Sequence, residues 1–213
     1  MIYTKETAAE TARMLLQIKA IKLNPANPFT WASGWKSPIY CDNRKILSFP
    51  DTRGKILEFF VDVVKAKYAN AEVIAGVATA GIPMGILIAH QLGLPFIYVR
   101  SSAKDHGLQN QIEGVLNAGQ KVVVVEDLIS TGGSSLRAVE AIRAAEGQVL
   151  GMAAIFSYAF PHAENNFAEV GCDLCTLSDY PHLIETALEQ GVIGSEQIDL
   201  LNQWREQPDT WGK

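Results

Sequence analysis

The chain alternates short runs of consecutive apolar residues with longer segments in which apolar residues recur every three or four positions. The apolar runs predict buried strands, and the periodic segments predict amphipathic helices. We expect strands at residues 73–77, 96–99, 122–126, 149–156 and 172–177. We expect helices at residues 4–20, 50–70, 82–92, 134–145, 163–167, 181–190 and 195–204. Strands that alternate with helices predict an α/β fold with a mainly parallel central sheet flanked by helices.

The N-terminal part of the chain does not follow this alternation. A turn-rich segment, Asn24-Pro-Ala-Asn-Pro28, comes after the first predicted helix. Two short extended pieces at 29–32 and 38–41 are candidates for a small hairpin-like lid. No linker rich in Pro, Gly or Ser divides the chain, so we expect one domain. Its expected parts are an N-terminal cap at about 1–45, an α/β core at about 46–178 and C-terminal helices at about 179–213.

Composition restricts the class of protein. An apolar content of 48% and a charged content of 19% are typical of a soluble globular protein. The net charge of −5 argues against general nucleic-acid binding, which requires a basic surface. No apolar run approaches ~20 residues, so no membrane span is expected. The polar N-terminus is unlike a signal peptide, and three cysteines suit a reducing compartment, so we expect a cytoplasmic protein.

Two of those cysteines, Cys172 and Cys175, form a C-x-x-C pair. A redox pair would begin a helix, whereas residues 172–177 are predicted to be a strand. The two thiols would then face opposite sides of the sheet. Because a second C-x-x-C is absent from the sequence, a zinc site is not supported, and we expect buried strand cysteines.

The segment Val122 to Ser135 carries the strongest chemical signal. Four valines of a predicted central strand lead directly into Glu126 and Asp127, and then into a loop of Ser, Thr and Gly before a helix. Backbone N–H groups at such a loop and helix N-terminus can bind a phosphate. The two carboxylates can accept hydrogen bonds from sugar hydroxyls or hold a divalent cation. The loop lacks the G-x-x-x-x-G-K-[ST] pattern of a P-loop.

Two further loops follow predicted strands, at the edge where ligands of open α/β sheets bind. Residues 78–81 are small, which would let a phosphate approach the backbone; a plain tight turn is the alternative. The stretch between Arg100 and Gly119 is long and polar, and we expect a mobile loop there. Arg100, Lys104 and His106 form a set suited to a multiply charged anion, and closure of the loop would exclude water.

Together these segments resemble known enzymes. Residues 126–134 resemble the phosphoribosyl pyrophosphate (PRPP) motif of type I phosphoribosyltransferases. The segment Ser33-Gly-Trp-Lys-Ser-Pro-Ile-Tyr-Cys-Asp-Asn-Arg44 resembles the N-terminal signature of the orotate phosphoribosyltransferase family, and residues 100–107 resemble its catalytic loop. The likeness, to a shorter bacterial subgroup, covers most of the chain.

The resemblance implies transfer of the 5-phosphoribosyl group from PRPP to orotate, giving orotidine 5′-monophosphate and pyrophosphate in pyrimidine biosynthesis. It implies Mg²⁺ as cofactor, bound mainly through PRPP and in part by Asp127, and a homodimer that shares the catalytic loop across subunits. It implies catalytic roles for Lys104, His106 and Asp127. It implies PRPP binding by Thr79, Ala80, Arg100, Lys104, His106, Glu126, Asp127, Leu128, Ile129, Ser130, Thr131, Gly132, Gly133 and Ser134.

The chain departs from some members of the family near the base. Those members carry a lysine at the position of Ala32, a Tyr-Lys pair at Thr79-Ala80, a lysine at Ser101 and an arginine near 159–161, and none is present here. A buried carboxylate still needs a partner. The remaining candidates for orotate are Ser130, Lys36, Arg44, Tyr40 as an apolar wall, and the backbone amides of 37–41.

Two other functions would account for part of this pattern. A purine phosphoribosyltransferase would share the PRPP loop but lack the signature at 33–44. A non-catalytic PRPP-binding regulator would lose Arg100, Lys104 and His106, and often adds a basic DNA-binding domain. No protein nucleophile is expected, since displacement at an anomeric carbon passes through an oxocarbenium-like state.

Overall fold

The computed structural model describes residues 2–31, 33–101 and 111–212. Its centre is a six-stranded sheet in the order β10-β9-β8-β5-β6-β7. All neighbouring pairs are parallel except β6 and β7, which are antiparallel. The strands are β5 (Val73–Val77), β6 (Phe96–Val99), β7 (Ile112–Glu113), β8 (Lys121–Ile129), β9 (Gln148–Ser157) and β10 (Leu174–Asp179). The predicted α/β fold with a mainly parallel sheet is confirmed.

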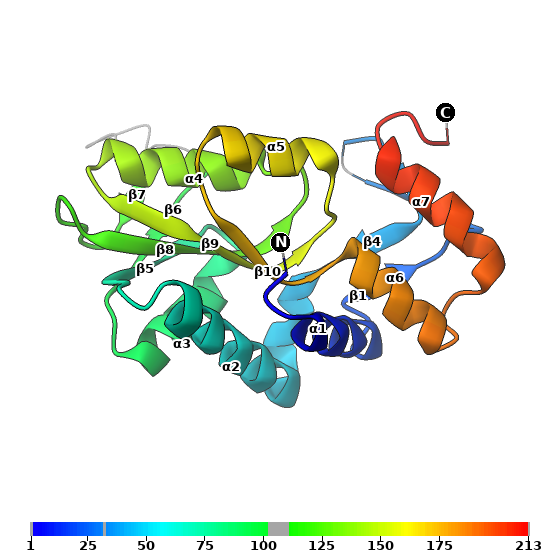
Figure 1. The fold of residues 1–213 in the computed structure, drawn as a ribbon, viewed down its shortest axis with the longest axis horizontal. Coiled ribbons are helices and arrows are strands. Elements are labelled where there is room, and N and C mark those ends of the chain that lie inside the picture. The colour runs from blue at the N-terminus through cyan, green and yellow to red at the C-terminus, as the bar shows by residue number, and fades with distance from the viewer. Residues whose placement is uncertain (1, 32, 102–110, 213) are drawn as a thin grey trace.

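Helices cover both faces of this sheet (Figure 1). One face is covered by α1 (Lys5–Gln17), α2 (Pro50–Lys67) and α3 (Gly81–Leu92), and the other by α4 (Gly133–Ala144) and α5 (Pro161–Glu169). With both faces covered, β5 is buried at every position, and so are the four valines 122–125 of β8. Burial on both faces explains why the sequence of these strands is continuously apolar and does not alternate.

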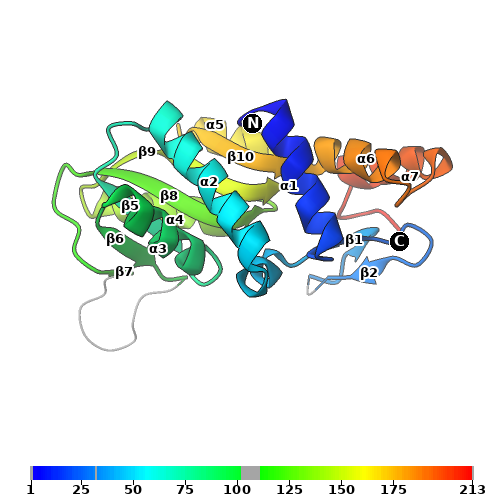
Figure 2. The same ribbon diagram turned by 90° about the horizontal axis from the view of Figure 1, so that it is seen from below.

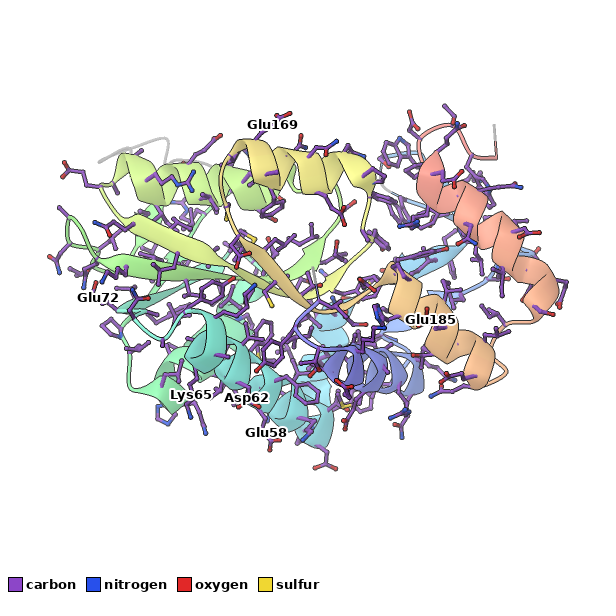
Figure 3. The ribbon with its side chains drawn as sticks, in the orientation of Figure 1. Glu58, Asp62, Lys65, Glu72, Glu169 and Glu185 are labelled. Carbon is purple, nitrogen blue, oxygen red and sulfur yellow. The ribbon has the colours of Figure 1, made fainter. Side chains whose placement is uncertain are left out.

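The helices show the expected division between a buried and a solvated face. On α2, Ile56 and Phe60 are fully buried. Glu58, Asp62 and Lys65 lie on its outer side (Figure 3). The helix begins at Pro50, which suits the first turn because proline lacks the N–H that would be unpaired there. These three charges therefore lie away from the sheet.

The N-terminal region forms two small antiparallel sheets. The pairs are β1 (Ile21–Leu23) with β4 (Ile39–Cys41), and β2 (Phe29–Thr30) with β3 (Lys36–Ser37). The predicted pairing of 29–32 with 38–41 is therefore wrong. Residues 29–30 pair with the nearby residues 36–37, and residues 39–41 pair with the more apolar segment 21–23. Strands of two or three residues are too short to be recognised from a sequence pattern.

The chain ends with α6 (Tyr180–Glu189), a short 3₁₀ turn η2 (Ser195–Gln197) and α7 (Ile198–Glu206). Figure 2 shows α6 and α7 at the same end of the molecule as β1 and β2. A 3₁₀ segment, η1 (Asn43–Ser48), joins the small sheets to α2. In the part of the chain that the structure describes, no helix has the length and apolar character needed to cross a lipid bilayer.

Three local predictions need correction. The strand predicted at 122–126 continues to Ile129, so Asp127 also belongs to β8 and not to a loop after it. Residues 112–113 form β7, within the stretch predicted to be a loop. Cys172 precedes β10 and only Cys175 lies within it, so the expectation of two thiols on opposite faces of one strand is wrong.

Candidate functional site

Two adjoining cavities lie where the carboxyl end of the sheet meets the N-terminal region. The larger has a volume of about 540 Å³ and the smaller about 280 Å³. The larger is lined by Cys41, Asp42, Arg44, Val77, Ala78, Thr79, Ala80, Glu126, Asp127, Leu128 and Ser134. The smaller is lined by Thr30, Trp31, Tyr40, Cys41, Leu128, Ser130 and Tyr158. Because Cys41 and Leu128 line both, ligands in the two cavities would meet at these residues.

One wall of the larger cavity is the loop between β5 and α3. This loop is held against β8 by close backbone packing at Gly81, where an added Cβ would collide with the carbonyl oxygen of Val125. The backbone N–H of Ala78 donates to the carbonyl oxygen of Val99 (2.9 Å), which fixes the start of the loop to β6. Thr79 is exposed, and both Thr79 and Ala80 face the cavity as predicted.

Glu126 is the more buried member of the acidic pair. Its side chain accepts hydrogen bonds from Ser135 Oγ and from the backbone N–H of Asp127, both 3.0 Å long. The residue is 6% exposed. Burial, followed by the neighbouring charge of Asp127, raises the pKa of Glu126 from its ordinary value to about 8. The surroundings of this carboxyl group therefore favour its neutral form.

Asp127 is more accessible and lines the larger cavity. Burial raises the pKa of Asp127, while hydrogen bonds from its surroundings and the positive charge of Arg44 oppose that rise. Its carbonyl oxygen accepts a hydrogen bond from Asn43 Nδ2 (2.7 Å), and Asn43 is itself buried. Asn43 thereby ties the predicted signature segment to the acidic strand.

The loop after β8 enters α4 through a glycine. Gly132 has a φ of +82°, the left-handed region, and an added Cβ would lie 2.9 Å from the ring of Phe167. Ser134, in the first turn of α4, lines the larger cavity. The free N–H groups at the start of a helix favour an anion at this place. Thr131 is exposed beside it, whereas Ile129 is fully buried and lines neither cavity among the described residues.

Aromatic rings dominate the smaller cavity. The rings of Trp31 and Tyr158 are tilted against each other with centroids 5.1 Å apart. Trp31 is oriented by a hydrogen bond from its Nε1 to the carbonyl oxygen of Ile39 (3.1 Å). Tyr40, at 41% exposure, forms another wall. Flat apolar walls beside the hydroxyl groups of Thr30 and Ser130 suit a flat heterocycle with polar edges.

The predicted cations lie in different places. Lys36 lines neither cavity directly, but its Nζ is 2.8 Å from Oγ1 of Thr30, which faces the smaller one. Arg44 lines the larger cavity and is bound to Asp42 (2.7 Å). Arg100 is not among the described lining residues, and its guanidinium faces Glu113 of β7 at 3.5 Å. Lys104, His106 and Ala32 lie outside the described residues, so statements about them stay predictions.

Sequence reasoning missed several residues of the site. Trp31 and Tyr158 were not singled out, although both fall inside or beside segments that were. Ser135 and Asn43 lie within quoted motifs but received no role of their own. One signal could have identified Ser135 and Asn43. Both are polar residues at buried positions, and buried polar groups need a hydrogen-bond partner.

This arrangement can hold an anionic, hydroxyl-rich ligand beside a flat ring. Comparisons with known proteins agree with it. Residues 52–182 match the model of the phosphoribosyl transferase domain family. An orotate phosphoribosyltransferase of Cytophaga hutchinsonii is 53% identical over 213 residues, covering 100% of both chains. One of Porphyromonas gingivalis is 56% identical over 201 residues, covering 94% of this chain and 96% of the relative.

Solved structures show the same fold. The orotate phosphoribosyltransferase of Aeropyrum pernix superposes with a TM-score of 0.75 at 28% identity, covering 86% of this chain and 99% of its own. The Mycobacterium tuberculosis enzyme in complex with PRPP superposes with a TM-score of 0.63 at 26% identity, covering 82% of this chain and 97% of its own.

Proposed function

This chain belongs to the orotate phosphoribosyltransferase family, and we infer from that premise that it is a pentosyltransferase acting on PRPP and orotate. The enzyme transfers the 5-phosphoribosyl group to orotate, which yields orotidine 5′-monophosphate and pyrophosphate in de novo pyrimidine biosynthesis. The observation that carries the assignment of substrates is the pair of cavities joined at Cys41 and Leu128. A bond can form only where the two ligands touch.

We assign PRPP to the larger cavity. The loop from Ser130 to Ser134 and the start of α4 would hold the 5′-phosphate, because the free N–H groups at a helix N-terminus favour an anion. Asp127 would accept hydrogen bonds from the ribose hydroxyls and stabilise the positive charge that develops on the ribose. Glu126 would support Asp127 from behind, through its hydrogen bond to the Asp127 N–H. Thr79 and Ala80 would meet the pyrophosphate from the opposite wall.

Orotate would occupy the smaller cavity, with its ring between Tyr40, Trp31 and Tyr158. Ser130 would contact the polar edge of the ring. The carboxylate has no charged partner among the lining residues that the structure describes. We propose that Lys36 supplies that charge through its contact with Thr30, helped by backbone amides of 37–41.

The residues present fit a Mg²⁺ ion carried by the substrate. Within residues 2–31, 33–101 and 111–212, no three His, Cys, Asp or Glu side chains come together as a metal cage. Mg²⁺ commonly keeps its waters and binds substrate phosphates with only one or two carboxylates, and Asp127 is placed for that role. When bound, the ion would neutralise charge on the leaving pyrophosphate.

We propose that Arg100, Lys104 and His106 complete the neutralisation of the leaving group, and that the loop carrying them excludes water during transfer. The family resemblance supports a homodimer in which this loop serves the neighbouring subunit. The division into an N-terminal cap, an α/β core and C-terminal helices is likewise our proposal, as is a cytoplasmic location. The odd number of cysteines supports that location, because it suits a reducing compartment better than a set of disulfides.

A panel of bases tests the assignment. Purified enzyme with PRPP and Mg²⁺ is offered orotate, uracil, adenine and hypoxanthine, and pyrophosphate release is measured. We expect orotate to exceed uracil by ~10⁴ in kcat/KM, because uracil leaves the donors for the carboxylate unpaired. Equal use of uracil would replace the proposal with a broad pyrimidine enzyme. Preference for adenine or hypoxanthine would overturn the substrate assignment.

A further inference from the structure

The C-terminal helix α7 contacts the smaller cavity from behind. Trp204 on this helix is fully buried, and its Nε1 donates a hydrogen bond to the carbonyl oxygen of Lys36 (3.2 Å). Its ring also meets two rings that line the cavity. The centroids of Trp204 and Trp31 are 5.7 Å apart at 83°, and those of Trp204 and Tyr158 are 5.7 Å apart at 80°. Both contacts have the edge-to-face geometry that aromatic pairs favour.

A second contact reaches the other wall of the cavity. Arg205 Nη1 donates to the carbonyl oxygen of Ala159 at 3.4 Å, directly after Tyr158. The backbone at Gly212 also lies close to Lys36, since a Cβ added there would be 3.3 Å from the Lys36 Cβ. The C-terminal segment therefore touches both the β2–β3 hairpin and the chain that follows β9.

The two walls touch each other through the rings of Trp31 and Tyr158, but the hairpin that carries Trp31 is small. The β2 and β3 strands are two residues each, and a hairpin of that size is not stable by itself. Trp31 lies on this hairpin, whereas Tyr158 follows β9 of the main sheet. Trp204 contacts both, and it also bonds to the hairpin backbone. Trp204 therefore supports the packing of Trp31 against Tyr158 from behind.

We propose that Trp204 is a positioning residue for the base: through Trp31, Tyr158 and the Lys36 carbonyl it sets the width of the orotate cavity. The inference rests on the assignment of the smaller cavity to orotate. It predicts a role for α7 in base binding, although no residue of α7 lines either cavity among those described.

The test is Trp204→Phe, which removes the indole N–H and one ring. We expect the KM for orotate to rise about tenfold, because small misplacements of binding groups have large effects. The KM for PRPP should stay within about twofold, since the larger cavity does not touch α7. The preference for orotate over uracil should fall by a similar factor.

Two controls separate positioning from general stability. Phe60→Leu removes part of a fully buried ring on α2 that lines neither cavity, and it should lower the melting temperature without a selective change in the KM for orotate. Asn202→Ala, at an exposed position of α7, should change neither quantity. If Trp204→Phe does not fold, Arg205→Gln carries the test, with an expected selective rise of about threefold in the KM for orotate.

Unchanged KM for orotate in a folded Trp204→Phe enzyme would overturn the inference. An equal rise in the KM for orotate and the KM for PRPP would also overturn it. So would a lower melting temperature without a selective change in the KM for orotate, as expected for Phe60→Leu. Wild-type enzyme that does not use orotate would instead refute the proposed function, and that result is read from the base panel before any variant is compared.

Discussion

Glu126 and Asp127 are neighbours in sequence with different surroundings. Both line the larger cavity, but Glu126 is buried and held by Ser135, whereas Asp127 is more accessible. We expect Asp127→Asn to lower kcat/KM by about a hundredfold, or ~3 kcal/mol, because the amide cannot supply the negative charge. Steady-state pyrophosphate release measures the effect, and circular dichroism shows whether the fold is kept.

The control for this variant is Asp62→Asn, on the outer side of α2 (Figure 3). It removes the same charge at an exposed position that is not among the described lining residues of either cavity, and it should leave kcat/KM within about twofold. An Asp127→Asn enzyme that behaves like Asp62→Asn would show that the cavity carboxylate has no part in the transition state.

The raised pKa of Glu126 predicts a pH dependence of stability. Its pKa of about 8 lies above the ordinary value, so the folded protein keeps a proton that the unfolded chain has released. The contribution of Glu126 to the free energy of unfolding should therefore be largest at acidic pH and fall as the pH rises from about 5 through about 8. The raised pKa of Asp127 acts in the same direction.

Glu126→Gln keeps the shape of this side chain and removes its titration. The melting temperature of the wild type without ligand should fall between about pH 5 and about pH 9, and that fall should be smaller in the variant. Parallel curves for the two proteins would mean that Glu126 is already ionised in the folded state.

At the scale of elements, the position of the loop between β5 and α3 depends on Gly81. A methyl group there would collide with the Val125 carbonyl oxygen, so Gly81→Ala should push the loop away from β8. We expect a loss of about 1–3 kcal/mol in the free energy of unfolding, as in other overpacked sites. The KM for PRPP should rise, because Thr79 and Ala80 move with the loop.

Gly54→Ala on α2 is the matched substitution. Nothing lies within 4 Å of a Cβ at this helical position. Alanine should there raise the free energy of unfolding by about 0.5–1 kcal/mol, because glycine has more backbone freedom to lose. Urea unfolding of the two variants compares them directly. Destabilisation by both would mean that the contact at Gly81 is not the cause.

Elements with strong local patterns were predictable from sequence. The strand at 73–77 was predicted with the boundaries that β5 has, because every residue of it is buried and apolar. The end of β8 was not, since the polar pair ended the predicted strand at Glu126, yet the ladder with β9 continues, with Leu128 opposite Phe156. A strand that ends in a ligand site carries polar residues there, so the apolar pattern of a buried strand does not mark its true end.

The candidate site was predictable in its polar half. Asp127, Ser134 and Thr79 were expected and line the larger cavity. The aromatic half depends on contacts between segments far apart in sequence, such as Trp31 with Tyr158 and both with Trp204. A single aromatic residue carries no periodic signal that could say which distant ring it meets.

At the scale of the whole molecule, the proposed homodimer makes a distinctive prediction. Lys104→Ala and Asp127→Asn should each be nearly inactive alone. Mixed and re-dimerised, they should recover part of the activity, because one of the two sites in a hybrid then has both an intact loop and an intact Asp127. Pyrophosphate release by separately tagged, co-purified heterodimers is the measurement.

Heterodimers that stay inactive would place the loop in its own subunit. A chain that is monomeric in sedimentation at assay concentration would contradict the assembly itself. Mixing either variant with an Asp127→Asn, Lys104→Ala double variant gives the background, since no hybrid site of that pair has both intact parts.

The two cavities share Cys41 and Leu128, while Trp31 and Tyr158 touch only the smaller one. This overlap bears on how such an enzyme can diverge. A substitution at a shared position alters the cavity for PRPP and the cavity for the base together. Selection that retains PRPP as the donor should therefore conserve the residues at those positions. Acceptance of a new base would have to begin at the rings that touch only the smaller cavity, and a laboratory evolution experiment towards another pyrimidine should accumulate its first changes there.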